Sequence, residues 1–221
     1  MKITSVEPQK NSAGRRTKRF NIFLDGQFAF GDDEDLVVDR RLIAGKEILK
    51  EDLEKLLQEA EVGKLMERMY GLLGRRQRSE KEIRDYFRIK NYESRIKKKS
   101  FVSELVIESV IDKLKRKGLV NDLEFAKAWV ESRSRKKGLN AIKSELINKG
   151  ISREIVEDVL ISQTSAVGEK TVAEKLLERK MKIWKNLPDL EFKQKALQFL
   201  MRRGFGYETS KQVLEKILKK E

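Results

Sequence analysis

The order of apolar and polar residues divides the chain into a short β-rich start and a long helical remainder. Two β-rich runs, residues 19–24 and 27–30, flank Asp25-Gly26, a pair that supplies the positive φ angles of a type I′ turn. They predict a β-hairpin whose first strand places alternate residues on one face; these are Phe20, Ile22 and Leu24. A further β-rich run covers residues 2–7, and residues 36–60 are predicted to be helical.

From Val62 onward, apolar residues recur at the 3.6-residue period of amphipathic helices. The first apolar stripe consists of Val62, Leu65, Met66, Met69, Leu72 and Leu73. The next helix is predicted to begin at Ser79, because Ser79 and Glu82 have the spacing of a capping box. A third helix carries an apolar stripe over residues 105–114 and is predicted to end before Gly118.

This three-helix unit occurs three times in the sequence. After an N-terminal extension over residues 1–60, which holds the β-hairpin and one helix, we assign the repeats to residues 61–120, 121–165 and 166–221. In the second and third repeats the middle helix ends in a basic residue and a glycine, at Lys149-Gly150 and Arg203-Gly204. The first repeat has Asn91-Tyr92 at this place, followed by an inserted basic loop over residues 93–100.

The pattern therefore predicts a mainly α protein, an elongated array of three tandem three-helix repeats with a small N-terminal β-hairpin segment. A unit of about 50 residues with a narrow apolar stripe cannot bury that stripe alone, so neighbouring repeats are expected to stack. We expect small-angle scattering to give a radius of gyration above the ~17 Å of a compact chain of this length.

Composition narrows the possible chemistry. The 221 residues include no cysteine and no histidine, so the chain can have no disulfide, no thiolate nucleophile, no imidazole acid or base and no Cys/His zinc site. Charge interrupts every apolar segment before it reaches the length of a membrane span, and the first ten residues lack the apolar core of a secretory signal. We expect a cytoplasmic, non-enzymatic protein without a metal or other cofactor.

Two short segments superficially suggest ligands. The acidic run Asp32–Asp35 lacks the alternating oxygen ligands and glycine of an EF-hand loop, so we expect it to cap the following helix rather than bind a metal. Residues 168–171 lack the glycine spacing of a P-loop. Trp129, Trp184 and Phe205 are predicted core residues rather than base-stacking platforms, and exposed aromatic residues interleaved with cations are not expected.

The charge points to a polyanionic partner. Fifty basic residues against 36 acidic residues give a net charge of +14. Three clusters, one in each repeat near the exit of its first helix, are candidates for binding a filament or DNA, and stacking would align them into a track. They are Arg75, Arg76, Arg78, Lys97, Lys98 and Lys99; Arg133, Arg135, Lys136 and Lys137; and Arg179, Lys180 and Lys182. The alternative for each residue is a solvated helix face with i,i+4 ion pairs.

Several motifs of the first two repeats resemble the RecX family, bacterial regulators of the RecA recombinase. The resemblance rests on Leu73–Ile83, Gly118–Asp122, Phe125-Ala126, Trp129, Arg133, Lys137-Gly138, Glu145-Leu146 and Lys149–Ile151. It implies a monomeric regulator that binds RecA and the groove of the RecA–DNA filament and mainly inhibits recombinase activity in DNA repair, recombination and the SOS response. Single- or double-stranded DNA is a further implied partner, and no membrane is involved.

Two other functions stay open beside the resemblance. The repeats could act as general nucleic-acid-binding modules that do not act on RecA, in which case the affinity for bare DNA should fall steeply with salt. A carboxylate-metal nuclease is disfavoured, because the sequence offers no cluster of Asp and Glu at ligand spacing.

Overall fold

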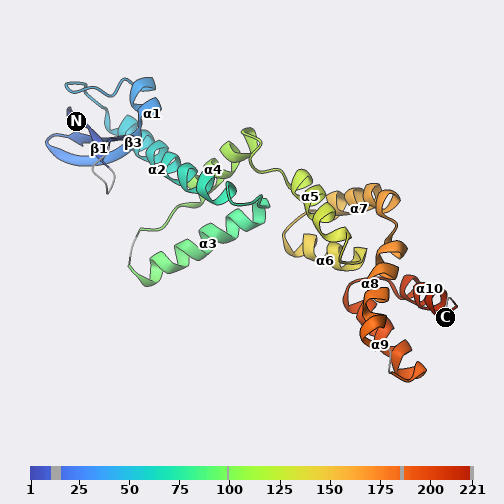
Figure 1. Cartoon of the computed structure of the whole chain (residues 1–221). Coiled ribbons are helices and arrows are strands. Elements are labelled where there is room, and N and C mark those ends of the chain that lie inside the picture. Colours follow the sequence, from blue (N-terminus) through green and yellow to red (C-terminus); the bar gives the residue numbers. More distant parts are fainter. Residues whose placement is uncertain (11–15, 99, 185–186, 220–221) are drawn as a thin grey trace. The chain divides into compact units, whose positions relative to one another are not determined.

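Three strands and ten helices follow one another along the described part of the chain (Figure 1). The computed structural model describes residues 1–10, 16–98, 100–184 and 187–219. The strands are β1 (Ile3–Lys10), β2 (Arg16–Leu24) and β3 (Gln27–Asp33). The helices are α1 (Glu34–Asp39), α2 (Lys50–Leu73), α3 (Glu80–Ile96), α4 (Glu104–Arg116), α5 (Asp122–Ser134), α6 (Leu139–Asn148), α7 (Arg153–Val167), α8 (Glu169–Trp184), α9 (Asp189–Arg202) and α10 (Tyr207–Leu218).

The strands form one antiparallel sheet in the order β1-β2-β3. Asp25 and Gly26 have φ angles of 47° and 83°, so the predicted turn between β2 and β3 is confirmed. Ile22 and Leu24 are buried and share a core with residues of α2. The sheet is therefore anchored to the start of the helical region through the face that the alternation predicts.

The predicted helix over residues 36–60 is wrong in its middle. Residues 40–49 leave the helical path, and Arg41 and Gly45 take positive φ angles. The backbone of this segment instead pairs with the first strand, since Ile3 N donates to Lys46 O at 2.9 Å. Leu42 and Ile48 are buried in the core of the sheet. As a result α2 begins at Lys50 and continues unbroken to Leu73, across the boundary that we placed at residue 60.

The acidic run after β3 caps a helix, as expected. The Asp33 side chain accepts a hydrogen bond from Leu36 N at 2.9 Å at the start of α1. Its neighbour Asp32 is only 1% exposed, and Oδ2 of Asp32 has no hydrogen-bond partner among the described residues. Burial raises the pKa of Asp32 to about 6, against a lowering by the hydrogen bond from the Asp33 backbone.

Each repeat contributes three helices, namely α2–α4, α5–α7 and α8–α10. The second and third repeats each enclose a core of their own; that of the second includes Phe125, Ile142 and Val156, and that of the third includes Leu177, Leu200 and Val213. By its contacts the chain divides into two compact units, residues 1–77 with 87–119, and residues 78–86 with 120–221. The first turns of α3 therefore belong with the second and third repeats.

The middle helix of the first repeat does not end where the repeat alignment places its turn. Asn91 and Tyr92 lie inside α3, which continues to Ile96, so the first residues of the predicted loop are helical. Asn91 nevertheless closes the insertion at its base. Its side-chain amide donates to Val102 O and accepts from Val102 N, both at 2.8 Å. The Asn91 side chain thus links α3 to the segment that leads into α4.

Candidate binding surface and repeat boundaries

The boundary between the second and third repeats is made largely by backbone groups. Gly138 N donates to Arg203 O at 2.9 Å, and Asn140 N donates to Gly204 O at 3.1 Å. Leu139 N donates to the Glu169 carboxylate at 3.0 Å. The N-terminus of α6, whose first amides have no partner within the helix, is therefore capped by groups from the following repeat.

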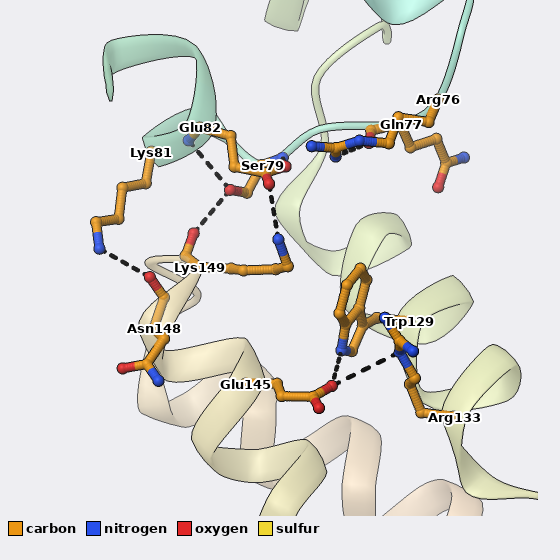
Figure 2. A network of polar contacts seen from close by, with 10 residues as sticks. All are labelled: Arg76, Gln77, Ser79, Lys81, Glu82, Trp129, Arg133, Glu145, Asn148 and Lys149. Atoms are coloured by element: carbon orange, nitrogen blue, oxygen red, sulfur yellow. Dashed lines mark hydrogen bonds and ion pairs between the residues drawn. The ribbon is translucent and has the colours of Figure 1, made fainter. Parts of the chain in front are cut away.

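The start of α3 meets the second repeat through the same kinds of group (Figure 2). Ser79 Oγ donates to Lys149 O at 2.7 Å, while the same hydroxyl accepts from Glu82 N in the predicted capping box. Glu80 N donates to Asp122 Oδ1 at 2.9 Å. The two boundaries are therefore alike. In each, the middle helix of one repeat begins beside the basic residue and glycine that end the middle helix of the following repeat. The first carboxylate in the first helix of that following repeat caps it.

The glycine of the basic-glycine pair is required by this arrangement. Gly204 has a φ of +89°, and a methyl group added to it would lie 2.2 Å from Cβ of Ala141. Gly150 has a φ of +82°, and its added methyl would lie 2.5 Å from Cβ of Lys81. The sequence analysis used these glycines only to align the repeats. It missed that the lack of a side chain lets the preceding repeat pack closely against them.

The basic residue of the pair also has a structural role that the sequence analysis missed. The ammonium group of Lys149 lies 4.6 Å from the centroid of the Trp129 ring and 2.7 Å from the Glu82 carboxylate. The guanidinium of Arg203 lies 5.2 Å from the centroid of Phe199 and donates to Lys136 O at 3.1 Å. Both cations therefore join their own repeat to the preceding one.

Trp129 lies beside Glu145 and Arg133 in the polar network of Figure 2. Its indole Nε1 donates to Glu145 at 2.8 Å, its ring stacks on Phe125, and the guanidinium of Arg133 lies 4.5 Å from its centroid. A ring with these neighbours offers little face to a nucleobase. The prediction that Trp129 packs in the protein is confirmed, although the ring remains half-buried.

Glu145, the acceptor of the Trp129 indole, also forms ion pairs with Arg133 and Lys137. Burial alone raises the pKa of Glu145, but hydrogen bonds from Lys137 and Trp129 and the charges of Lys137 and Arg133 together hold the pKa below its usual value. Arg133 and Lys137 thus contact a carboxylate of their own repeat. Of the four cations predicted in this cluster, Arg135 and Lys136 remain exposed on the turn between α5 and α6.

The other predicted binding residues differ in exposure. Exposed side chains are Arg75, Arg76, Lys97, Lys98, Arg179 and Lys182, whereas Arg78 and Lys180 are half-buried. Arg76 donates to Gln77 O at 2.9 Å, and Lys180 lies 5.8 Å from the centroid of Phe199. Lys99 falls outside the described residues. Among the predicted binding residues of the second and third repeats, the exposed ones are Arg135, Lys136, Arg179 and Lys182. The boundary fixes these two repeats to each other.

One expectation about aromatic residues is wrong. Tyr92 and Phe101 are 66% and 71% exposed, and together with Arg95 they line a cleft in the first repeat. The sequence analysis placed a turn at Asn91-Tyr92, so it missed the helical face on which Tyr92 lies.

Two kinds of feature are absent from the part of the chain that the structure describes. No helix there has the length and apolar character needed to cross a bilayer. No group of three or more Asp and Glu side chains there could hold a metal ion.

Family profiles and homologues cover nearly all of the chain. Residues 1–49 match the regulatory protein RecX N-terminal domain, residues 121–160 match the second three-helix domain of RecX, and residues 169–214 match its third. A regulatory protein RecX from Clostridium perfringens is 30% identical over 222 residues, covering 100% of this chain and 98% of that protein. The chain belongs to the RecX family. Its second and third helical repeats, as assigned from the sequence, contain the two matched three-helix domains.

Other RecX proteins agree with this assignment. Regulatory protein RecX of Listeria monocytogenes is 32% identical over 216 residues, covering 96% of this chain and 74% of that protein. A crystal structure of regulatory protein RecX matches with a TM-score of 0.72 and 25% identity over 97% of this chain and 98% of that one. RecX from Lactobacillus salivarius matches with a TM-score of 0.59 and 25% identity over 70% of this chain and 95% of that one.

Proposed function

We propose that this RecX-family protein binds RecA and its nucleoprotein filament and mainly inhibits recombinase activity, without catalysing a reaction itself. The observation that carries the proposal is the pair of exposed cation clusters on the second and third repeats, Arg135 with Lys136 and Arg179 with Lys182. The repeat boundary holds these two clusters in a fixed position relative to each other. Such a fixed spacing suits binding to a polymer whose negative charges repeat at regular intervals.

Two features support a role for the second-repeat cluster. Arg135 and Lys136 lie on the turn that leads into the boundary, and the Lys136 carbonyl accepts a hydrogen bond from Arg203 of the third repeat. The turn is therefore held at its backbone while both side chains point their charges into solvent. Preorganised charges of this kind increase association rates with an oppositely charged partner and lose less freedom on binding.

The test is the DNA-dependent ATP hydrolysis of RecA measured with substoichiometric amounts of this protein. We expect the wild-type chain to lower the rate and shorten the filament lifetime, and the double variant R135E/K136E to lose most of this effect. The matched control is K170E/K211E, which changes the net charge equally at two exposed lysines of the third repeat. Unchanged hydrolysis and filament lifetime with the wild-type chain would contradict the proposal.

A general nucleic-acid binder is the second candidate, favoured by the net charge of +14. Such a protein would bind bare DNA as well as coated strands. Its affinity would fall by about 10³ to 10⁵ between 50 and 200 mM salt if about 6 to 10 phosphates were contacted. Much tighter binding to RecA-coated strands than to bare strands would decide against this candidate.

A further inference from the structure

The last turns of α3 expose an apolar stripe in the first compact unit. Ile89, Tyr92 and Ile96 follow the i, i+3, i+7 spacing of one helix face and are 55%, 66% and 64% exposed. Apolar side chains on a surface helix normally face the core, and contiguous exposed ones mark binding surfaces. The stripe spans the turn position of the other repeats, and Ile96 lies on the part of α3 that extends beyond it.

A cleft opens beside the stripe, between the end of α3 and Phe101. It has a volume of about 650 Å³ and is lined by Asn91, Tyr92, Arg95 and Phe101. Phe101, 71% exposed, is next in sequence to Val102, whose backbone the Asn91 amide holds at both its N–H and its carbonyl. Two exposed aromatic rings and one guanidinium therefore line the same cleft. The two hydrogen bonds of Asn91 link the segments that carry the rings.

The charge around this cleft is strongly positive. Residues 87–98 contain five basic side chains and one acidic side chain. The acid, Glu93, is paired with Lys90 at 2.7 Å. Arg95, Lys97 and Lys98 are exposed, and all three lie within six residues after Tyr92.

We propose that this cleft binds single-stranded nucleic acid, with unpaired bases stacking on Tyr92 and Phe101 and the phosphates facing Arg95, Lys97 and Lys98. Flat rings interleaved with cations are the combination that single-strand-binding grooves use, and the apolar stripe offers further contact to bases and sugars. Duplex bases are already stacked and cannot enter. The proposal narrows the general nucleic-acid binding considered above to single strands at one cleft, and it does not depend on binding to RecA.

A protein segment is the competing occupant of an apolar cleft. The stripe contains two isoleucines, which suit a protein as well as a base. The surrounding positive charge would favour an acidic protein over a neutral one. We favour nucleic acid because both rings that line the cleft are aromatic and a guanidinium lies between them in sequence, and we make the protein an outcome of the test.

The experiment measures anisotropy of two labelled oligonucleotides of 20 units with the full-length chain and no RecA. One is oligo(dT), and the other is an abasic strand with the same phosphates but no bases. We expect the wild-type chain to prefer oligo(dT), and we expect Y92A and F101A each to bind oligo(dT) about tenfold more weakly while binding the abasic strand within twofold of wild type. R95Q should instead weaken both strands and reduce the salt dependence by about one phosphate contact.

The control is Y207A, which removes a tyrosine that is 54% exposed at the start of α10 and should leave both affinities unchanged. Equal binding of the two strands by the wild-type chain would overturn the proposal, as would Y92A and F101A variants that keep the preference for oligo(dT). Variants that lose affinity for RecA-coated strands but not for oligo(dT) would also overturn it and assign the cleft to a protein. Each of these results leaves the RecA assay with R135E/K136E to be judged separately.

Discussion

The two compact units differ in how their half-buried and buried carboxylates are hydrogen-bonded. At the repeat boundaries of the second unit, Asp122 and Glu169 each accept a backbone N–H from the start of a neighbouring helix, and Glu145 accepts from Trp129 and Lys137. In the first unit, Asp32 is buried with one oxygen that lacks a hydrogen-bond partner among the described residues. The boundary carboxylates therefore stabilise the second unit, whereas the burial of Asp32 costs the first unit stability.

The difference follows from how each unit is assembled. A helix N-terminus always offers unpaired amides, and the tandem arrangement repeatedly places a carboxylate at one. The sheet has no such recurring donor, since its strands use their own amides in the ladder. The comparison predicts that the two units respond differently to pH and to substitutions at the boundaries.

The largest effect is expected for Gly204→Ala. The substitution forces a side chain into a positive φ and against Ala141, and we expect it to lower the free energy of unfolding by about 3 kcal/mol. Gly118→Ala is the matched control, because Gly118 has a φ of +68° at the end of α4 and no atom within 4 Å of its added methyl. It should cost about 1 kcal/mol. Equal losses in denaturant titrations would mean that the boundary adds nothing to the backbone strain.

Asp32→Asn should stabilise the first unit at neutral pH. The folded-state pKa of Asp32 is raised from 3.8 to about 6 by burial, so between these values the folded chain holds a proton that the unfolded chain has released. The free energy of unfolding therefore falls as pH rises from about 4 to 6, by about 1 to 3 kcal/mol in total. The variant should lack this fall, whereas Asp35→Asn, at an exposed position, should keep it.

Glu145 gives the opposite sign in the second unit. Its pKa is held below the usual value of 4.5, so its contribution to stability is present above that value and is lost as pH falls. Following the unfolding of both units by hydrogen exchange across pH would show opposite trends. Parallel trends would contradict the comparison.

Asp122→Ala tests the boundary cap itself. It removes the acceptor for Glu80 N, and the loss of a capping carboxylate at a helix N-terminus should cost about 1 kcal/mol. The amide of Glu80 should then exchange faster. Glu124→Ala, two positions further and exposed, removes a carboxylate without a boundary contact among the interactions described and should change stability by less than about 0.5 kcal/mol.

Asn91→Ala has the smallest expected effect on stability. It removes the two hydrogen bonds to Val102 and should cost up to about 1 kcal/mol, because the insertion is on the surface and water can replace the amide. Faster exchange of the Val102 amide would report the loss directly. Preserved protection of that amide would show that other contacts hold the insertion.

Much of this architecture follows from local signals in the sequence. The hairpin turn is fixed by Asp25-Gly26, and the starts of α3 and α7 by serine caps at Ser79 and Ser152. Each of these signals acts within four residues of the chain. The apolar period from Val62 onward likewise predicts the helices, because one continuous face must be buried.

The features that the sequence did not reveal depend on contacts between distant segments. The path of residues 40–49 is decided by pairing with β1, which outweighs the helical pattern. The sequence alone does not show that Arg133 and Lys137 pair with Glu145, because that carboxylate lies on the following helix. For Tyr92, the missing glycine at the end of the first middle helix was the available signal: without it, α3 continues and presents the ring on a helix face.

The shared boundary chemistry has a consequence for building related molecules. The second and third repeats each contact the middle helix of the preceding repeat through the same two features. One is the basic residue with glycine at the end of the middle helix, and the other is the first carboxylate of the first helix. A chain in which the second repeat is duplicated should therefore contain a third boundary of the same chemistry and be longer by one three-helix unit.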